Sequence, residues 1–491
     1  MEGRAVVVSS QLPWTVSSED ECPAFLRPNL AEQVRTLDSI MWKSGGTWVG
    51  CSPSHTGTSD DCADALRGGF NTQGYRNAPV LLTPEEKARH DGFSNQVIWP
   101  MFHSLPLQCR PSLDHWSGYC RVNGKMAEAV RLAAREEDFV WVHDYPLMMV
   151  SSLLRANGWR GRVGYFHHIA FPYPTILATL PWRVELLHAL LQFDLIGFQT
   201  DDDRRNFVAC LSAFLPFGPA SEVADHSILR ILDRETKTGV YPLGIDFDEF
   251  SWESANPGII RASDAIRKYM SGTRIVLSVE RLDFTAGIFE RVIAFRRLLE
   301  RYPDTRNKVT LIQVTTPCSD SAPDYKWSRY QLESIIHQIN EEFGDGTYTP
   351  IWYYSKPLTY AQLVAFYRSA DIAFMTPLKS GMNIASREFC ACKNDDRGVL
   401  ILSEFAAASD ELKRAALLVN PYDIDGAAST LHHSLTMHES EQKRRMSALR
   451  LYIRSNDVFS WSESFHADAA TFGHSPSLRR MPSEGARNEI R

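Results

Sequence analysis

The chain has 491 residues, 44% of them hydrophobic and 23% charged, a composition typical of a globular protein of two or three domains. Its formal net charge of −7 argues against a nucleic-acid or membrane-surface partner. No run reaches the ~18 apolar residues that a membrane span needs, and the N-terminus lacks the basic and apolar regions of a signal peptide. The nine cysteines show no framework spacing, so we expect reduced thiols and a cytoplasmic protein.

The predicted elements begin with a strand at Ala5–Ser9. From about residue 126 onward, helical segments alternate with apolar strands, which we predict at 139–143, 162–168 and 194–200. Such alternation predicts a parallel sheet with helices on both faces. The stretch 51–80 is rich in Ser, Gly, Asp and Thr and is predicted to be a surface excursion, and 474–491 is predicted to be a disordered tail.

A second series of strands and helices follows a predicted hinge at 242–250. Its strands are predicted at 274–279, 308–314, 350–354, 371–376, 398–403 and 416–420. The fold class is therefore α/β, with two Rossmann-like doubly wound domains at 1–243 and 244–456. Because ligands of open parallel sheets bind at the carboxyl ends of the strands, we expect the two domains to face a cleft.

Polar side chains follow two of the predicted strands. Asp144 comes directly after the strand at 139–143, and His167 and His168 end the next one. Because strand residues alternate between faces, only one of the two histidines is expected to point into the cleft. Asp144 has two interpretations, a helix cap or a cleft residue. We expect no metal site, because no carboxylate or cysteine stands at ligand spacing from these histidines.

Two glycine turns follow strands of the second series. The turn at 379–381 opens a helix predicted to begin at about Met382, and free backbone N–H groups at a helix start favour an anion. Glu388 falls about two turns further on, near enough to reach a ribose. The other turn is "ERLDFTAG" at 280–287. A plain strand-to-helix turn is the alternative interpretation of both segments.

Nine segments in the same order resemble the trehalose-6-phosphate synthase family, glycosyltransferase family 20. They include "HDYPLM" from residue 143, "HHIAFPYPTILATLPWR" from 167, "ERLDFTAGI" from 280 and "TPLKSGMNIASREF" from 376. The resemblance implies a GT-B fold with a sugar-nucleotide site between the two domains. It also implies transfer with retention of anomeric configuration, no required metal, and a final helix, here 457–473, that crosses back to the first domain.

The resemblance also implies roles for the residues at matching positions. Asp144 matches the aspartate of the acceptor hydroxyl, His168 the histidine that contacts the donor glucose, and Trp99 an aromatic residue of the acceptor site. Arg281 matches the arginine that binds the diphosphate, and Glu388 the carboxylate on the nucleotide ribose. The implied catalytic residues are Asp144, His168 and Arg281, and the implied nucleotide site comprises Arg281, Gly381, Met382, Asn383, Ile384 and Glu388.

Several polar positions depart from the family pattern. A loop lysine is replaced by Ala286, and a carboxylate expected near the donor sugar by Ser380. Gln11 and Ser319 stand where arginines would hold the acceptor phosphate. A charge-assisted hydrogen bond contributes about 1.5–3 kcal/mol, so the loss of two arginines would cost about two to four decades of acceptor affinity.

Three functions remain open from the sequence. The first is a retaining glucosyltransferase that moves glucose from a nucleoside diphosphate sugar, such as UDP-glucose, to glucose 6-phosphate or a related acceptor, with Lys379 or Arg387 as replacement cations. The second is a pseudoenzyme, a regulatory subunit of a trehalose synthase complex. The third is a relative with an unphosphorylated or cyclitol acceptor. The expected partners are these substrates and either a second copy of the chain or an active synthase subunit.

Overall fold

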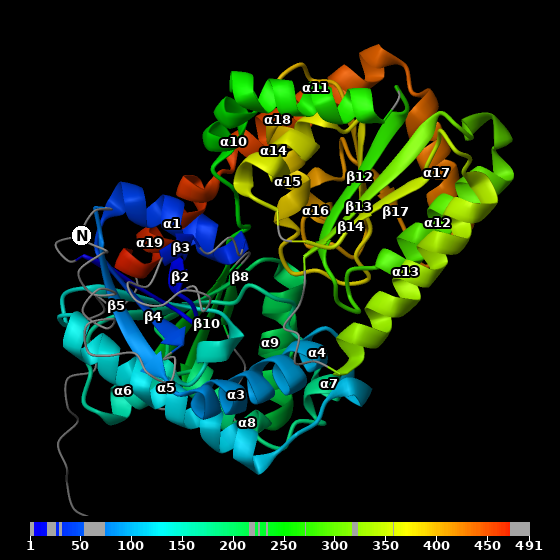
Figure 1. Cartoon of the computed structure of the whole chain (residues 1–491). Helices are drawn as coiled ribbons and strands as arrows, with labels where there is room; N and C mark the ends of the chain where they lie inside the picture. Colours follow the sequence, from blue (N-terminus) through cyan, green and yellow to red (C-terminus); the bar gives the residue numbers. More distant parts are fainter. Residues whose placement is uncertain are drawn as a thin grey trace, which may run out of the picture.

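The structure is a computed structural model that describes residues 4–16, 26–28, 32–53, 74–215, 221–223, 226–231, 234–270, 272–316, 323–356 and 358–471. Figure 1 shows two lobes, one built mainly from the first half of the chain and one from the second. In the described ranges each lobe contains one large sheet. The predicted tail at 474–491 and the position of Ser319 lie outside the described residues.

The N-terminal sheet has nine strands within the described ranges, in the order β5-β4-β1-β6-β7-β8-β11-β10-β9. The strands from β5 to β11 in that order run parallel, and β10 and β9 are added antiparallel at one edge. The bounds are β1 Ala5–Ser9, β4 Thr47–Pro53, β5 Arg76–Leu82, β6 Phe139–His143, β7 Val163–Phe166, β8 Leu195–Phe198, β9 Ser221–Val223, β10 His226–Ile231 and β11 Arg234–Val240. A short ribbon pairs β2 (Trp14–Val16) with β3 (Leu26–Pro28).

The C-terminal sheet has six strands, all parallel within the described ranges, in the order β14-β13-β12-β15-β16-β17. The bounds are β12 Arg274–Arg281, β13 Val309–Thr316, β14 Ile351–Tyr354, β15 Ile372–Met375, β16 Val399–Ser403 and β17 Leu417–Val419. The two sheets confirm the prediction of two Rossmann-like units. The exact division at 243 and 456 stays a prediction.

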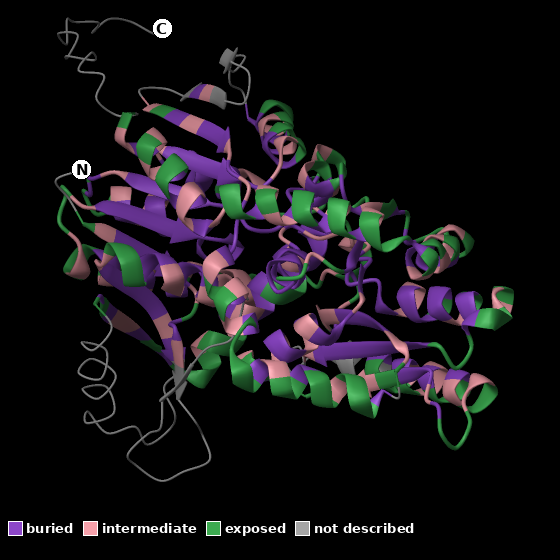
Figure 2. Ribbon diagram, turned by 90° about the horizontal axis from the view of Figure 1, so that it is seen from above, coloured by how far each residue is buried: buried purple, intermediate pink, exposed green. Residues whose placement is uncertain are grey.

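Helices cover both faces of each sheet, and the central strands are buried on both sides. Val7 in β1 and Trp141 in β6 belong to one apolar cluster, and their neighbours Val6, Val8 and Val140 belong to another on the opposite face. Figure 2 shows the strands almost entirely buried and the exposed residues on the outer sides of the helices. Continuous apolar runs such as "FVWVH" are therefore buried on both faces, as expected for parallel strands.

In the N-terminal lobe, α5 begins well before residue 126, from which the sequence predicted alternating helices and strands. The helices of this lobe are α1 Glu32–Ser44, α3 Pro84–Phe93, α4 Trp99–Phe102, α5 Leu113–Ala133, α6 Val150–Ala156, α7 Pro174–Leu177, α8 Arg183–Leu190 and α9 Asp201–Phe214. A π-helix at Ser94–Ile98 joins α3 to α4. The predicted excursion at 51–80 is shorter than expected, because residues 51–53 belong to β4 and residues 76–80 to β5.

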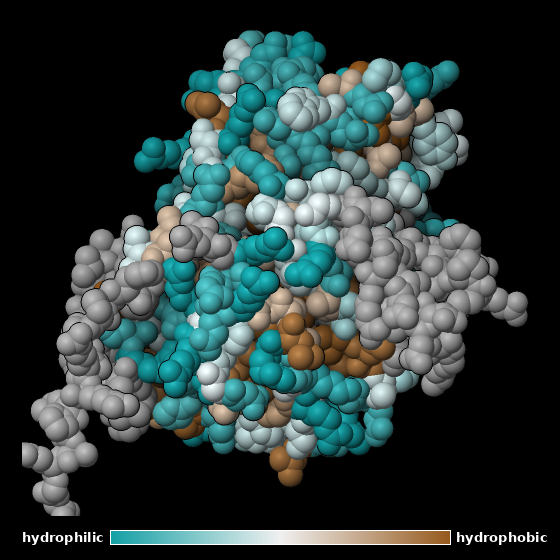
Figure 3. Space-filling model, turned by 90° about the vertical axis from the view of Figure 1, so that its left-hand side faces the viewer, coloured by the Kyte–Doolittle hydropathy of each residue, from teal (hydrophilic) through white to brown (hydrophobic). Residues whose placement is uncertain are grey.

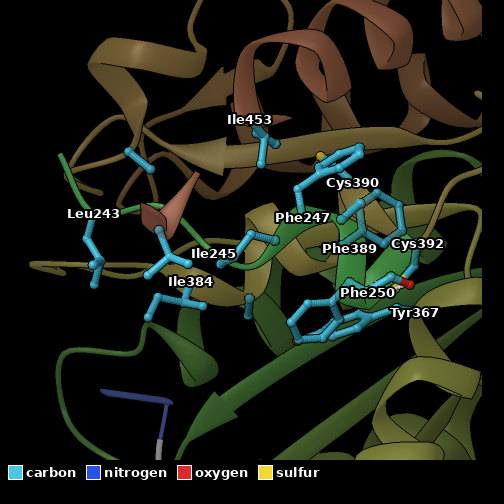
Figure 4. Packing of buried hydrophobic residues seen from close by; sticks show 14 of the residues in the cluster. Leu243, Ile245, Phe247, Phe250, Tyr367, Ile384, Phe389, Cys390, Cys392 and Ile453 are labelled. Carbon is cyan, nitrogen blue, oxygen red and sulfur yellow. Dashed lines mark hydrogen bonds between the residues drawn. The ribbon is translucent and has the colours of Figure 1, made fainter. Parts of the chain in front are cut away.

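In the C-terminal lobe, α15 begins at Ile384, two residues later than predicted, after Asn383 in a left-handed conformation. The helices here are α10 Phe247–Ser254, α11 Pro257–Tyr269, α12 Ile288–Arg301, α13 Pro323–Phe343, α14 Tyr360–Ser369, α15 Ile384–Ala391, α16 Ser409–Leu412, α17 Ile424–Thr436 and α18 Glu439–Ser455. Figure 4 shows Ile384 and Phe389 of α15 packed among Leu243, Ile245 and Phe250, which fixes this helix against the segment that joins the lobes.

The last described helix, α19 (Val458–Thr471), returns to the N-terminal lobe and lies beside α1 (Figure 1). Phe465 stacks on Trp141 with ring centroids 4.9 Å apart, and Asp468 forms an ion pair with Lys237 at 2.9 Å. Because α18 lies in the C-terminal lobe and α19 in the N-terminal one, the chain crosses between the lobes twice.

Figure 3 shows hydrophilic residues over most of one side of the molecule, with a smaller hydrophobic area near its centre. Within the described part of the chain, none of the helices combines the length and apolar character that a bilayer span requires.

Candidate active site

Asp144 lies directly after β6 in a strained backbone conformation, with φ 72°. Such a conformation costs a non-glycine residue about 1–3 kcal/mol and is concentrated at functional sites. Its carboxylate accepts a hydrogen bond from the His168 backbone N–H at 3.1 Å and makes no cap on the following 3₁₀ helix, so the helix-cap interpretation is wrong. Burial raises the pKa of Asp144 to about 7, although backbone N–H groups and Arg281 act in the opposite direction.

The two histidines after β7 face different surroundings, as the alternation of strand residues predicted. His167 Nδ1 lies 3.0 Å from the Tyr165 hydroxyl, and its ring packs on Phe102 in the N-terminal core. His168 Nε2 lies 3.0 Å from His143 Nδ1, and burial lowers the pKa of His168 to about 3. His168 Nδ1 is buried and has no hydrogen-bond partner among the described residues. A neutral imidazole with one nitrogen uncommitted can serve a sugar hydroxyl.

The opposite lobe contributes Arg281 at the end of β12. Its guanidinium carbon lies 5.5 Å from the centroid of the Trp99 ring, and its Nε donates to Asp283 at 3.3 Å. Trp99 in turn stacks on His103, with ring centroids 4.3 Å apart. Burial lowers the pKa of His103 to about 4, so the ring is neutral beside the cation. The predicted diphosphate arginine and the predicted acceptor aromatic are therefore in direct contact across the lobes.

The glycine turn before α15 also touches the N-terminal lobe. A Cβ atom on Gly381 would lie 2.5 Å from the His168 carbonyl oxygen and 2.6 Å from Ile169 Cα, so only glycine allows this approach. Lys379 donates to the Ser104 hydroxyl at 2.8 Å, which is another contact between the lobes. Further along the turn, Met382 is half-buried, and Asn383 Oδ1 is buried without a partner among the described residues. The carboxyl ends of β6, β7, β12 and β15 thus converge at one place.

Glu388, in the second turn of α15, is buried with both carboxylate oxygens engaged. One oxygen accepts from Arg35 of α1, in the other lobe, and the other accepts from the Tyr367 hydroxyl at 2.8 Å. The sequence placed Glu388 on a nucleotide ribose, but it gave no indication of Arg35. No pattern signals this pair, because its members lie 353 residues apart.

Of the positions that depart from the family pattern, all but Ser319 lie within the residues that the structure describes. The Ala286 side chain is buried in the apolar cluster of α12, and Gln11 is exposed. The Ser380 backbone forms a bridge with Ala406. Lys379 lies between the lobes, as a replacement cation would. Arg387 does not, because it is 2% exposed and its Nη2 donates to Glu411 at 2.6 Å within the C-terminal lobe; that expectation is wrong.

This arrangement has two Rossmann-like lobes whose strand ends meet around a buried carboxylate, an uncommitted imidazole and an arginine, and it defines a glycosyltransferase of the GT-B class. The family model for glycosyltransferase family 20 matches residues 3–471, so the chain belongs to that family.

Relatives with known names support this membership. The chain is 36% identical over 476 residues to a bifunctional trehalose-6-phosphate synthase/phosphatase from Thermoproteus tenax, covering 94% of this chain but only 63% of that relative. It resembles the crystal structure of a UDP-forming alpha,alpha-trehalose-phosphate synthase from Burkholderia xenovorans in complex with glucose-6-phosphate, with a TM-score of 0.86 and 30% identity over 95% of this chain and 100% of that one. An E. coli structure bound with UDP-2-fluoro glucose matches with a TM-score of 0.83 and 30% identity, over 95% and 98% of the two chains.

Proposed function

We propose that this protein is a retaining glucosyltransferase that moves glucose from a nucleoside diphosphate glucose to glucose 6-phosphate or a closely related acceptor. The observation that carries the proposal is the convergence of Asp144, His168 and Arg281 where the strand ends of the two lobes meet. The names of its relatives point to the same reaction, and the E. coli relative's ligand points to UDP-glucose as the donor.

In the proposed donor site, Arg281 and the backbone N–H groups at the start of α15, from Gly381 to Ile384, hold the diphosphate. The helix dipole adds a favourable positive potential there. His168 Nδ1 bonds a hydroxyl of the donor glucose, and Glu388 serves the nucleotide ribose. Negative charge grows on the departing diphosphate in the transition state, so Arg281 contributes more to the transition state than to the ground state.

In the proposed acceptor site, the sugar stacks on Trp99 while the Asp144 carboxylate orients its attacking hydroxyl. The bond from the glucose anomeric carbon to the phosphate oxygen breaks, and the new bond to the acceptor oxygen forms on the same face. The proton of the acceptor hydroxyl passes to the departing phosphate oxygen. This route gives retention and needs neither a protein nucleophile nor a metal ion.

A second candidate is a regulatory subunit that binds nucleotide without turnover. The specific observation that favours it is Ala286, which buries a methyl group where the family has a lysine, so that one diphosphate cation is missing. The engaged state of Glu388 points in the same direction.

A turnover experiment separates these candidates. Purified protein is incubated with UDP-glucose or GDP-glucose and with glucose 6-phosphate, glucose or a cyclitol, and products are observed by proton NMR. We expect UDP release and an α-anomeric signal in the new disaccharide. Folded protein that binds UDP but forms no product with any acceptor would support the regulatory candidate. Product with only the unphosphorylated acceptors would change the assigned acceptor.

A further inference from the structure

Arg35 lies at the seam between the two lobes, with its side chain directed into the C-terminal lobe. It projects from α1 and pairs with Glu388 of α15, and its side chain is 20% exposed against 2% for that of Glu388. The guanidinium carbon lies 5.5 Å from the Phe250 ring centroid and 5.9 Å from that of Tyr360. Two aromatic faces and a buried carboxylate thus set the position of this arginine in the present structure.

The Arg35 guanidinium also influences a second carboxylate. Burial raises the pKa of Glu249, while Tyr360 and the positive charge of Arg35 lower it. Arg35 therefore compensates negative charge from both Glu388 and Glu249. Removing a partner from a buried ion pair leaves an uncompensated charge. The loss of Arg35 therefore changes the electrostatic environment of both carboxylates.

The Arg35 pair occupies an oxygen that a nucleotide needs. Glu388 has two carboxylate oxygens, and in this structure one accepts from Arg35 and the other from the Tyr367 hydroxyl. The α15 helix rises about 1.5 Å per residue, so Glu388 lies about 7.5 Å along its axis from Asn383, on the helix whose start holds the diphosphate in the proposed function. The Glu388 side chain is 2% exposed with Arg35 in place, so ribose hydroxyls reach it only when the Arg35 side chain moves aside.

We propose that Arg35 is a specificity-determining residue of the nucleotide site, because it competes with the nucleotide ribose for Glu388. The proposal rests on the proposed function, in which Glu388 serves the ribose. Binding of a nucleoside diphosphate exchanges the Arg35–Glu388 pair for ribose contacts, whereas a diphosphate without a ribose leaves the pair intact. The affinity for a nucleotide is thereby lowered by the free energy of the pair, and affinity for the bare diphosphate is not.

The test compares ligands with and without ribose by isothermal titration calorimetry on the full chain. The variants are Arg35→Leu, which removes the charge and the donor, and Arg35→Gln, which removes the charge and keeps a hydrogen-bond donor in case Arg35→Leu does not fold. The matched control is Lys237→Met, because Lys237 also forms a partly buried ion pair with a distant carboxylate but lies away from the site. The probes are UDP, GDP and inorganic pyrophosphate.

We expect Arg35→Leu to bind UDP and GDP about tenfold more tightly than the wild type, with a smaller gain for Arg35→Gln. Pyrophosphate affinity should stay within about twofold in both variants, and Lys237→Met should bind all three probes like the wild type. Unchanged or weaker UDP binding by folded Arg35 variants would overturn the proposal, as would an equal gain for pyrophosphate. Failure of the wild type to bind any nucleotide would instead overturn the proposed function, so the two failures are distinguishable.

Discussion

At the scale of single residues, Asp144 has several unusual features at once. It has a positive φ, a buried carboxyl group and a raised pKa, and it contacts the His168 backbone that the other lobe approaches through Gly381. A carboxylate that orients a hydroxyl must be ionised, because only the ionised form presents acceptors alone. In the proposed acceptor site, the protonation state of Asp144 therefore controls whether the acceptor is held for attack.

The first prediction concerns pH. Because burial raises the pKa of Asp144 to about 7, the carboxylate is protonated below this pH and ionised above it. We expect kcat/KM to fall about tenfold per pH unit below pH 7 and to level off above it. Asp144→Asn should lower activity about a hundredfold or more and abolish this acidic limb. A wild-type profile that is flat from pH 5 to pH 8 would contradict the assignment.

The second prediction concerns the missing cation. Ala286→Lys combined with Ser380→Asp restores the two side chains of the family pattern, and a charge-assisted contact to the diphosphate contributes about 1.5–3 kcal/mol. We expect kcat with UDP-glucose to rise about tenfold or more. Because Ala286 is buried, the thermal midpoint should be recorded in parallel. A folded double variant with unchanged or lower kcat would show that the lost lysine does not limit the reaction.

At the scale of elements, α19 joins the C-terminal chain to the N-terminal sheet. Phe465 is fully buried between Trp141 and Phe166, with ring centroids 4.9 Å and 5.9 Å away, and Gly164 and Gly197 of β7 and β8 leave room for its ring. Truncating such an aromatic residue costs about 3–5 kcal/mol. The helix therefore contributes to the N-terminal fold as well as to the connection between lobes.

The third prediction follows for Phe465→Ala, which should lower the urea midpoint of unfolding of the N-terminal lobe markedly. The measurement is urea unfolding followed by circular dichroism. Leu451→Ala on α18 is the control, because Leu451 is 70% exposed and its truncation should change the midpoint little. An unchanged midpoint for Phe465→Ala would mean that α19 is not required for the stability of the sheet.

Element positions followed closely from the sequence where apolar runs were continuous. β1 and β6 have the predicted bounds, because each is buried on both faces and bounded by polar residues. The start of α15 was misplaced by two residues, since Asn383 adopts a left-handed conformation that its sequence did not signal. Arg35 could not be predicted, because its contact with Glu388 depends on how two lobes meet and not on local spacing.

At the scale of the whole molecule, the structure has its lobes in contact at the strand ends. Gly381 lies against the His168 backbone, Lys379 reaches Ser104, and Arg35 reaches Glu388. The proposed site is assembled by these contacts, since neither lobe alone brings Asp144 and Arg281 together. Activity should therefore depend on how closely the lobes approach.

The fourth prediction tests this dependence. Gly381→Ala places a Cβ 2.5 Å from the His168 carbonyl oxygen and so prevents the observed approach. We expect activity to fall about a hundredfold, because small displacements of reacting groups have effects of this size, while the thermal midpoint changes little. The control is Gly346→Ala, whose Cβ would meet no atom within 4 Å. Near wild-type turnover by Gly381→Ala would show that the close contact is not needed.

The central claim is that the meeting lobes hold a nucleoside diphosphate sugar through Arg281, and calorimetric titration with UDP-glucose and GDP-glucose tests it most directly. We predict saturable binding of at least one donor by the wild type and a loss of about tenfold or more in affinity for Arg281→Met, since one charge-assisted contact to the diphosphate is removed. Absence of saturable binding of both donors by folded wild-type protein, or equal affinity in Arg281→Met, would contradict the claim.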